Sequence, residues 1–319
     1  LHQTYYFLGQ LAARHRKLQL AEQLFRNAIR GAHKETRGDA YIGLIDVLRM
    51  AGKPTELADV CQRGLENAET VAPFYFNYYL SEALAELGKG DAAIVAADKA
   101  IQDTGHSDRL TVRLHKVSIL RTLEKWDAAI ALANKLLAEF PAPADRLQTR
   151  YSLATTYWLA GKRTEAETEL RTILEIDPDY AGACNDLGFH LADMGRDLEE
   201  AERLIRNAIA VDKYDRKKSG AAELENSMFI DSLGWVLFRK GKLTEARIEL
   251  ERAVGLYEGA SDPIVWDHLG DVLFRLGEKA KAKAAWEQSV TLCENDARIS
   301  TRRRDNRLDE VKRKLKQVP

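Results

Sequence analysis

The strings that most resemble catalytic motifs in this chain contain glycine. Residues 88–93, Gly-Lys-Gly-Asp-Ala-Ala, have the spacing of a dinucleotide-binding loop, whose glycines let the backbone approach a pyrophosphate. That chemistry requires a preceding β-strand, whereas residues 80–87 have the periodicity of an amphipathic helix. Gly234 and Gly241 resemble a phosphate-binding loop, but they are seven places apart and a helix is predicted between them. We therefore interpret these glycines as parts of helix pairs.

Metal-ligand and nucleophile patterns are incomplete in the sequence. His190 lies six residues beyond Cys184 without a second ligand pair at zinc spacing, and none of the seven histidines forms a His-Glu-x-x-His motif. No serine lies in a nucleophile-elbow string. Cys61, Cys184 and Cys293 are widely separated, which is atypical of a disulfide framework. We expect no catalytic residue, no metal site and no cofactor, and therefore a protein that is not an enzyme.

One short phrase recurs at a fixed period and identifies the elements that carry these residues. It reads Asn-Asp-Leu-Gly at 185–188, Asp-Ser-Leu-Gly-Trp at 231–235 and Asp-His-Leu-Gly-Asp at 267–271. In the last two copies the matching positions, such as Gly234 and Gly270, are 36 residues apart. Apolar and small residues recur at spacings of three and four on both sides of a second, glycine-centred turn, which predicts a helix-turn-helix unit.

These units resemble the tetratricopeptide repeat, in which Trp-x2-Leu-Gly-x2-Tyr is followed by Ala-x3-Phe. The last copy fills that pattern, with Leu273 in place of the tyrosine, through Trp266, Leu269, Gly270, Ala282 and Trp286. The resemblance covers nearly the whole chain as eight repeats at about 3–36, 39–72, 75–108, 111–145, 148–180, 181–214, 227–261 and 263–297. It implies an all-α fold, a right-handed superhelix of stacked helix pairs that forms a single solenoid domain over residues 1–319.

Two segments depart from the repetition. Gly188 and Gly234 are 46 residues apart, and the surplus is a polar stretch that predicts an insertion loop at 213–226. Near the end, a narrow apolar stripe on a charged segment predicts a capping helix over 298–317. That segment carries nine basic and three acidic residues. We favour a solvated capping face for it, and contact with nucleic acid, anionic lipid or an acidic partner is the alternative.

Composition narrows the possible classes of partner. The net charge of −1 gives no global electrostatic reason to bind nucleic acid or anionic membrane. No apolar run reaches the roughly 18 residues of a membrane-spanning helix.

The chain begins at Leu1 instead of methionine, so we expect a processed or trimmed protein whose signal or anchor would lie outside it. The last repeats resemble those of bacterial proteins, many of them at the cell envelope, which leaves cytoplasm and periplasm both open.

The resemblance implies that function lies in the groove lined by the first helix of each pair. Side chains at fixed offsets from the repeat glycine should point into it: Tyr78, Tyr151, Trp158, Asn185, Phe189, Asp231, Trp235, Arg239, Asp267, Asp271 and Arg275. Aromatic rings suit contact with an extended peptide or a partner helix, and neighbouring carboxylates suit a cationic one. Packing between helices is the alternative for the aromatics, and helix N-terminal electrostatics for the aspartates. We predict a protein-binding scaffold with no small-molecule substrate, or alternatively a regulatory or substrate-recruiting segment of a larger enzyme or envelope assembly.

Overall fold

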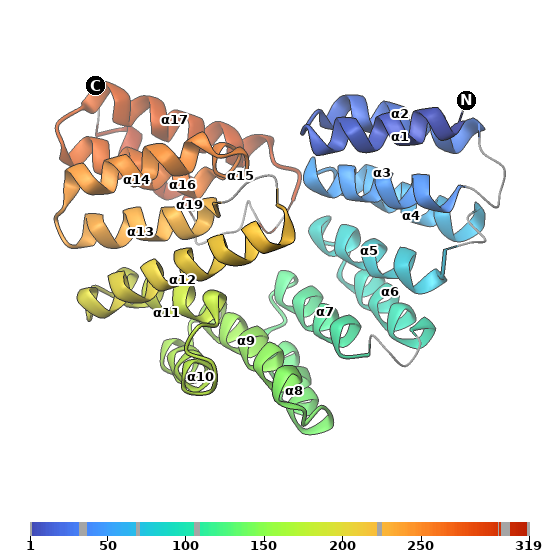
Figure 1. Ribbon diagram of the computed structural model, residues 1–319, viewed down its shortest axis with the longest axis horizontal. Coiled ribbons are helices and arrows are strands. Elements are labelled where there is room, and N and C mark those ends of the chain that lie inside the picture. Colours follow the sequence, from blue (N-terminus) through green and yellow to red (C-terminus); the bar gives the residue numbers. More distant parts are fainter. Residues whose placement is uncertain are drawn as a thin grey trace. The chain divides into compact units, whose positions relative to one another are not determined.

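The computed structural model describes residues 2–31, 37–67, 71–104, 109–221, 225–298, 300 and 307–317. Helices are the regular elements of these residues, and no strand occurs among them (Figure 1). Of the described helices, sixteen form eight pairs: α1 (His2–Arg14) with α2 (Leu18–Gly31), α3 (Gly38–Met50) with α4 (Pro54–Asn67), α5 (Pro73–Glu86) with α6 (Gly90–Asp103), α7 (Arg109–Thr122) with α8 (Trp126–Glu139), α9 (Pro143–Leu159) with α10 (Arg163–Ile176), α11 (Ala181–Met194) with α12 (Leu198–Ser219), α13 (Ser227–Arg239) with α14 (Leu243–Gly255), and α16 (Pro263–Arg275) with α17 (Lys279–Asn295). The short α15 (Tyr257–Ala260) and the terminal α19 (Arg307–Leu315) lie outside the pairs. The prediction of an all-α repeat fold with about eight helix-turn-helix units and a terminal helix is confirmed.

The turn inside a pair requires a residue in the left-handed region. Gly241, between α13 and α14, has a φ of 77°, and Gly277, between α16 and α17, has a φ of 82°. The N–H of Lys242, one residue further, reaches back to the carbonyl of Leu237 at 2.9 Å. This hydrogen bond satisfies an orphan carbonyl at the end of the first helix, and it lets the second helix begin within a few residues. Gly88, in the string that resembles a dinucleotide loop, has a φ of 72° and lies in such a turn between α5 and α6.

The first helices of the last two repeats begin with the same device. Asn226 accepts a hydrogen bond from the N–H of Met228 at 3.0 Å, and Asp262 accepts one from the N–H of Ile264 at 2.8 Å. Each side chain satisfies one of the four unpaired N–H groups at a helix start. Because these caps are themselves 36 residues apart, they set α13 and α16 in the same register.

The described residues group into two compact units. Unit 1 comprises residues 1–145 and 296–301, and unit 2 comprises residues 146–295 and 302–319. Each has its own buried apolar cluster, which includes Phe25, Ile45 and Phe76 in unit 1 and Leu187 and Trp286 in unit 2. The single solenoid domain over the whole chain stays a prediction.

The segment predicted as an insertion loop differs from the structure over its first half. Residues 213–219 continue α12, which runs to Ser219 and ends at Gly220 with a φ of 71°. Arg216 pairs with Asp212 at 2.7 Å one turn earlier, and the basic residues of the last turn interact favourably with the helix dipole. The polar composition of residues 213–219 therefore reflects their exposure to solvent on a helix and does not indicate a loop. Residues 222–224 lie outside the described residues.

The C-terminal helix is shorter in the described residues than its predicted range of 298–317. Helix α19 spans Arg307–Leu315, and residues 299 and 301–306 lie outside the described part of the chain. Its apolar stripe packs on unit 2 through Val311, which is fully buried, and Leu315, which is partly buried. Among the described helices, none is both long and apolar enough to cross a bilayer.

Candidate partner-binding surface

A continuous series of aromatic and imidazole rings crosses four successive first helices of unit 2. We call it the ring ladder, and in spatial order it consists of Trp158 on α9, His190 and Phe189 on α11, His268 on α16, and Trp235 and Phe238 on α13. The two histidines are buried, whereas the other four rings are half-buried. The ladder therefore has a packed interior and an accessible edge.

The spacing of the rings shows direct contact along the ladder. Trp158 and His190 stack with centroids 3.3 Å apart, and Trp235 and His268 stack at 4.3 Å. Phe189 links the two stacks, with centroids 6.5 Å from His190 and 6.4 Å from His268. The contacts of Phe189 lie in the range of about 4.5–7 Å over which aromatic pairs are stabilised beyond the area they bury. The repeats thus hold the rings in fixed mutual positions.

Arginines lie along the same surface. Arg163 lies 3.6 Å from the ring centre of Trp158, and Arg275 lies 5.6 Å from that of Phe238. Arg239 lies 5.8 Å from the Trp235 ring and donates a hydrogen bond to the backbone carbonyl of Asp193 at 2.8 Å, which joins α13 to α11. Cation–π contact and, for Arg239, a backbone bond orient these side chains. Arg275 is exposed, so its charge is available to a partner.

Three buried polar atoms along the ladder have no hydrogen-bond partner among the described residues. They are Nδ1 of His190, Nε1 of Trp235 and Oδ1 of Asn185. Burial lowers the pKa of His190 to about 3, and Arg163 acts in the same direction. His190 is therefore a neutral ring near pH 7, in contrast to a proton donor poised for acid–base chemistry.

Asp231 and His268 form a buried polar pair between α13 and α16. The Nδ1 atom of His268 lies 2.9 Å from Oδ1 of Asp231, and the two residues are 2% and 6% exposed. The contact orients the imidazole that stacks on Trp235. Asp231 was predicted to face a partner in the groove, but the structure places it between two helices, where its carboxylate is already satisfied.

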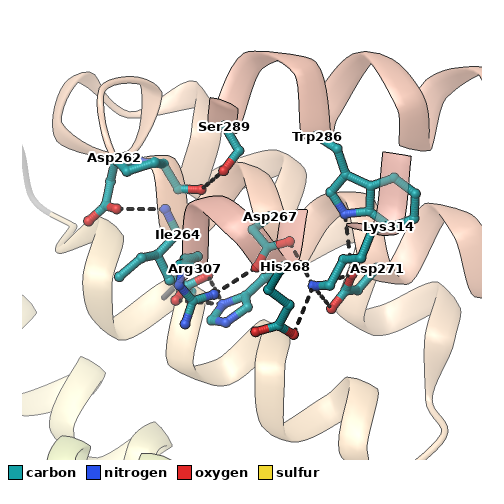
Figure 2. A network of polar contacts seen from close by, with 12 residues as sticks. Asp262, Ile264, Asp267, His268, Asp271, Trp286, Ser289, Arg307 and Lys314 are labelled. Atoms are coloured by element: carbon teal, nitrogen blue, oxygen red, sulfur yellow. Dashed lines mark hydrogen bonds and ion pairs between the residues drawn. The ribbon is translucent and has the colours of Figure 1, made fainter. Parts of the chain in front are cut away.

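Asp267, the counterpart of Asp231 one repeat later, is buried by the terminal helix α19. It is 1% exposed and accepts hydrogen bonds from Arg307 Nη1 at 2.7 Å and from Lys314 Nζ at 2.8 Å. Figure 2 shows the Lys314 amino group between Asp267 and Asp271, which it also contacts at 2.8 Å. The indole N–H of Trp286 donates to Asp271 at 3.2 Å. The predicted acidic part of the groove is thus occupied by cations of the same chain.

The charges in this cluster shift each other's protonation. Burial and the neighbouring Asp267 raise the pKa of Asp271, while Lys314 opposes that shift. Burial alone lowers the pKa of Lys314, but the two carboxylates outweigh burial and raise it. Lys314 therefore carries its charge at neutral pH in a site that excludes most solvent.

Two further predicted residues, Tyr151 and Tyr78, are not members of the ring ladder. Tyr151 packs against Tyr180, with ring centres 5.4 Å apart. Tyr78, in unit 1, stacks on His115 at 3.5 Å, and burial followed by the effects of Tyr79 and Glu82 raises the pKa of Tyr78 to about 12. Both tyrosines are half-buried and lie on first helices, as predicted.

The sequence interpretation missed the histidines and the role of α19. His190 was considered only as a zinc ligand, which the sequence did not support, and His268 was treated only as part of the recurring phrase, although each follows an aromatic or acidic groove position by one residue. Because imidazole rings can stack on tryptophan, the predicted groove positions of Trp158 and Trp235 were the signal that could have indicated a role for these histidines. The described residues hold no cluster of three or more metal-ligating side chains, and the three cysteines are buried and form no disulfide.

Comparisons with known proteins identify the repeat. A family model described as tetratricopeptide repeat matches residues 116–181 and 232–297, and the second segment includes most of α13, the whole of α14 and the pair α16–α17. The chain therefore contains tetratricopeptide repeats (TPRs) in these two segments. The helix pairs in these segments of this TPR protein therefore correspond to repeats predicted from the sequence.

Similar proteins match this TPR protein over different lengths. A TPR repeat-containing protein of Pseudomonas aeruginosa is 28% identical over 177 residues, which are 56% of this chain and 28% of that protein. The match therefore spans about a quarter of that relative. A TPR protein of Parabacteroides merdae superposes with a TM-score of 0.53 and 16% identity over 86% of this chain and 96% of its own. One from Thermus thermophilus gives a TM-score of 0.46 and 21% identity over 63% of this chain and 98% of its own.

Proposed function

We propose that unit 2 of this TPR protein is a non-enzymatic scaffold that binds an extended segment of a partner protein along the ring ladder. TPR repeats indicate a protein-interaction scaffold in general, and the proposal assigns that role to one surface. The same surface would serve if the chain is a recruiting segment of a larger assembly.

The observation that carries the proposal is the continuity of the ladder across four repeats. Trp158, Phe189, Trp235 and Phe238 are half-buried, so each retains apolar surface that a partner can cover. Burial of such surface contributes about 25 cal/mol per Å². Because the rings are already ordered by stacking, little side-chain entropy is lost on binding. Rigid aromatic anchors of this kind dominate the energetics of protein interfaces.

The charges left exposed give the surface its selectivity. Asp231 and Asp267 are satisfied inside the protein, whereas Arg275 is exposed and Arg239 is half-exposed. A partner segment with apolar or aromatic residues followed by a carboxylate near Arg275 would match this pattern. This differs from the cationic guest that the aspartates alone suggested.

The test uses peptides selected for binding to the immobilised protein from a random display library. Affinity for the selected peptides is then measured for Trp158→Ala/Phe189→Ala and for a matched control, Ile176→Ala/Ile248→Ala. The control residues are exposed apolar side chains on the second helices α10 and α14 of the same unit. We expect at least roughly a tenfold loss in the ladder variant and less than about a twofold change in the control.

Circular dichroism spectra establish that both variants keep the helical content of the wild type. Equal peptide affinity in the folded ladder variant and the control would contradict the proposal. Selected peptides whose binding depends on the second helices would place the binding surface elsewhere in the repeat.

A further inference from the structure

Helix α19 presents a regular set of side chains to the rest of unit 2. Arg307, Val311, Lys314 and Leu315 occupy positions i, i+4, i+7 and i+8, which share one face of a helix. Val311 is 1% exposed, and Arg307 and Lys314 retain 18% and 17% of their side-chain exposure. The opposite face is exposed and charged. This spacing of anchors is the way amphipathic helices dock into grooves of other proteins.

The surface beneath α19 complements that face in both charge and shape. Asp267 and Asp271 of α16 receive the two cations, and Val311 joins the apolar cluster that contains Trp286. The carboxylate of Asp267 has two charge-assisted partners from α19 (Figure 2). Such paired contacts specify both the chemistry and the register of the helix that fits.

The terminal contact differs from a contact inside the array because α19 belongs to none of the eight helix pairs. It has nine residues, a length at which an isolated helix is marginal in water. Terminal elements of an array have fewer stabilising neighbours than internal ones. If α19 leaves, Asp267 and Asp271 become hydrated, so they are not left as buried unpaired charges. The cost of exchange is therefore limited to the contacts of this one helix.

We propose that the α16–α17 face beneath α19 is a docking site for a basic amphipathic helix of a partner protein, which α19 occupies until such a helix displaces it. The partner helix carries cations at i and i+7 and apolar residues at i+4 and i+8. The proposal stands on α16, α17 and α19 and does not depend on binding at the ring ladder.

The experiment uses a fluorescein-labelled peptide with the sequence of residues 305–318 as the probe and the full chain as the receptor. Fluorescence anisotropy gives its affinity for the wild type and for Arg307→Ala/Lys314→Ala. In the variant the internal competitor is weakened, so a larger fraction of molecules has an open site. We expect the peptide to bind the variant at least roughly tenfold more tightly than the wild type.

Two matched variants check that the peptide occupies the proposed face. Lys312→Ala removes an exposed ion pair with Glu294 on α17, and we expect less than about a twofold change in peptide affinity. In a combined variant that carries Arg307→Ala/Lys314→Ala together with Asp267→Asn/Asp271→Asn, the gain in peptide affinity should be lost. Equal affinity of the wild type and Arg307→Ala/Lys314→Ala, or binding that survives loss of both aspartates, would overturn the proposal.

A second measurement covers the case in which the combined variant does not fold. Saturating peptide added to the wild-type chain should accelerate hydrogen exchange of the amides in α19 while leaving those of α13 and α14 unchanged. Unchanged exchange of α19 in the presence of bound peptide would show that the peptide binds elsewhere, and the proposal would fail while the ring-ladder function remained open to its own test.

Discussion

The last two repeats of unit 2 carry an aspartate at the same position of the repeat, yet the two aspartates have different partners. Asp231 and Asp267 are 36 residues apart, and both are buried on a first helix. The next first helix supplies His268 to Asp231, whereas α19 supplies Arg307 and Lys314 to Asp267. We call the contact of Asp231 with His268 the interior junction and the contact of Asp267 with α19 the terminal junction. The position in the repeat places an aspartate at each junction, and the neighbouring helix decides whether the contact is permanent or exchangeable.

The largest expected effect comes from breaking the interior junction. His268→Ala removes the hydrogen-bond partner of the buried Asp231 and the ring that stacks on Trp235. Removing one member of a buried polar pair costs about 3–5 kcal/mol when the other cannot reach water. Urea denaturation followed by circular dichroism measures the free energy of unfolding. A loss below about 1 kcal/mol would mean that the interior junction opens as easily as the terminal one.

The repeat glycines offer a second contrast between these two copies. A Cβ atom at Gly270 would lie 2.4 Å from Cδ1 of Trp286, and one at Gly234 would lie 2.5 Å from Cγ of Leu250. Overpacking typically costs about 1–3 kcal/mol. Because a buried indole has fewer ways to move than a leucine, we expect Gly270→Ala to lower the melting temperature more than Gly234→Ala. Equal losses would show that the helix pair shifts as a whole.

A smaller effect should follow from acidification, through the other tryptophan–histidine stack. His190 has no partner for its Nδ1 among the described residues and a pKa of about 3, against 6.5 for a free histidine. Below pH 6.5 the unfolded chain therefore binds a proton that the folded chain does not, so the stability contribution is lost as pH falls toward 3. From about pH 6.5 to about 5.5 this histidine should cost about 1 kcal/mol.

The matched variant for the pH prediction is His190→Phe, which keeps a ring but removes the titration. Its free energy of unfolding should fall less steeply between about pH 6.5 and about 5.5 than that of the wild type. An identical slope in the two proteins would show that His190 is protonated in the folded state.

The smallest effect on global stability is expected at the terminal junction. Lys314→Ala removes the shared cation of Asp267 and Asp271. Because α19 can detach and both carboxylates can then be hydrated, we expect a loss below about 1 kcal/mol. Denaturation in parallel with His268→Ala checks this difference. A loss as large as that of His268→Ala would remove the distinction between the two junctions.

The sequence predicted the repeats well because small and apolar residues at fixed spacing have one main physical role. Gly234 and Gly270 indicate that two helices pack closely, and their 36-residue period indicates that the helix pairs stack. Trp286 packs against Gly270. The partners of polar residues are not encoded in that spacing. Asp231 and Asp267 look alike in sequence, and their burial depends on side chains that are 37 to 47 positions away.

Other features of the site were hidden for related reasons. The rings of His190 and His268 become part of the ladder because neighbouring helices set them beside tryptophans. The helical state of residues 213–219 depends on local charge pairs and not on apolar periodicity. The C-terminal segment is visibly basic in the sequence, but its spacing does not show that Arg307 and Lys314 contact Asp267.

Native-state hydrogen exchange of the wild-type chain, resolved by peptide mass spectrometry, tests the contrast between the two junctions most directly. We predict that the amides of α19 exchange through a local opening, with a free energy at least about 2 kcal/mol below that of α13 and α16. Asp231 and His268 should stay within the slowest-exchanging part of unit 2. Exchange of α19, α16 and α13 in one cooperative step, at a single free energy, would contradict the account.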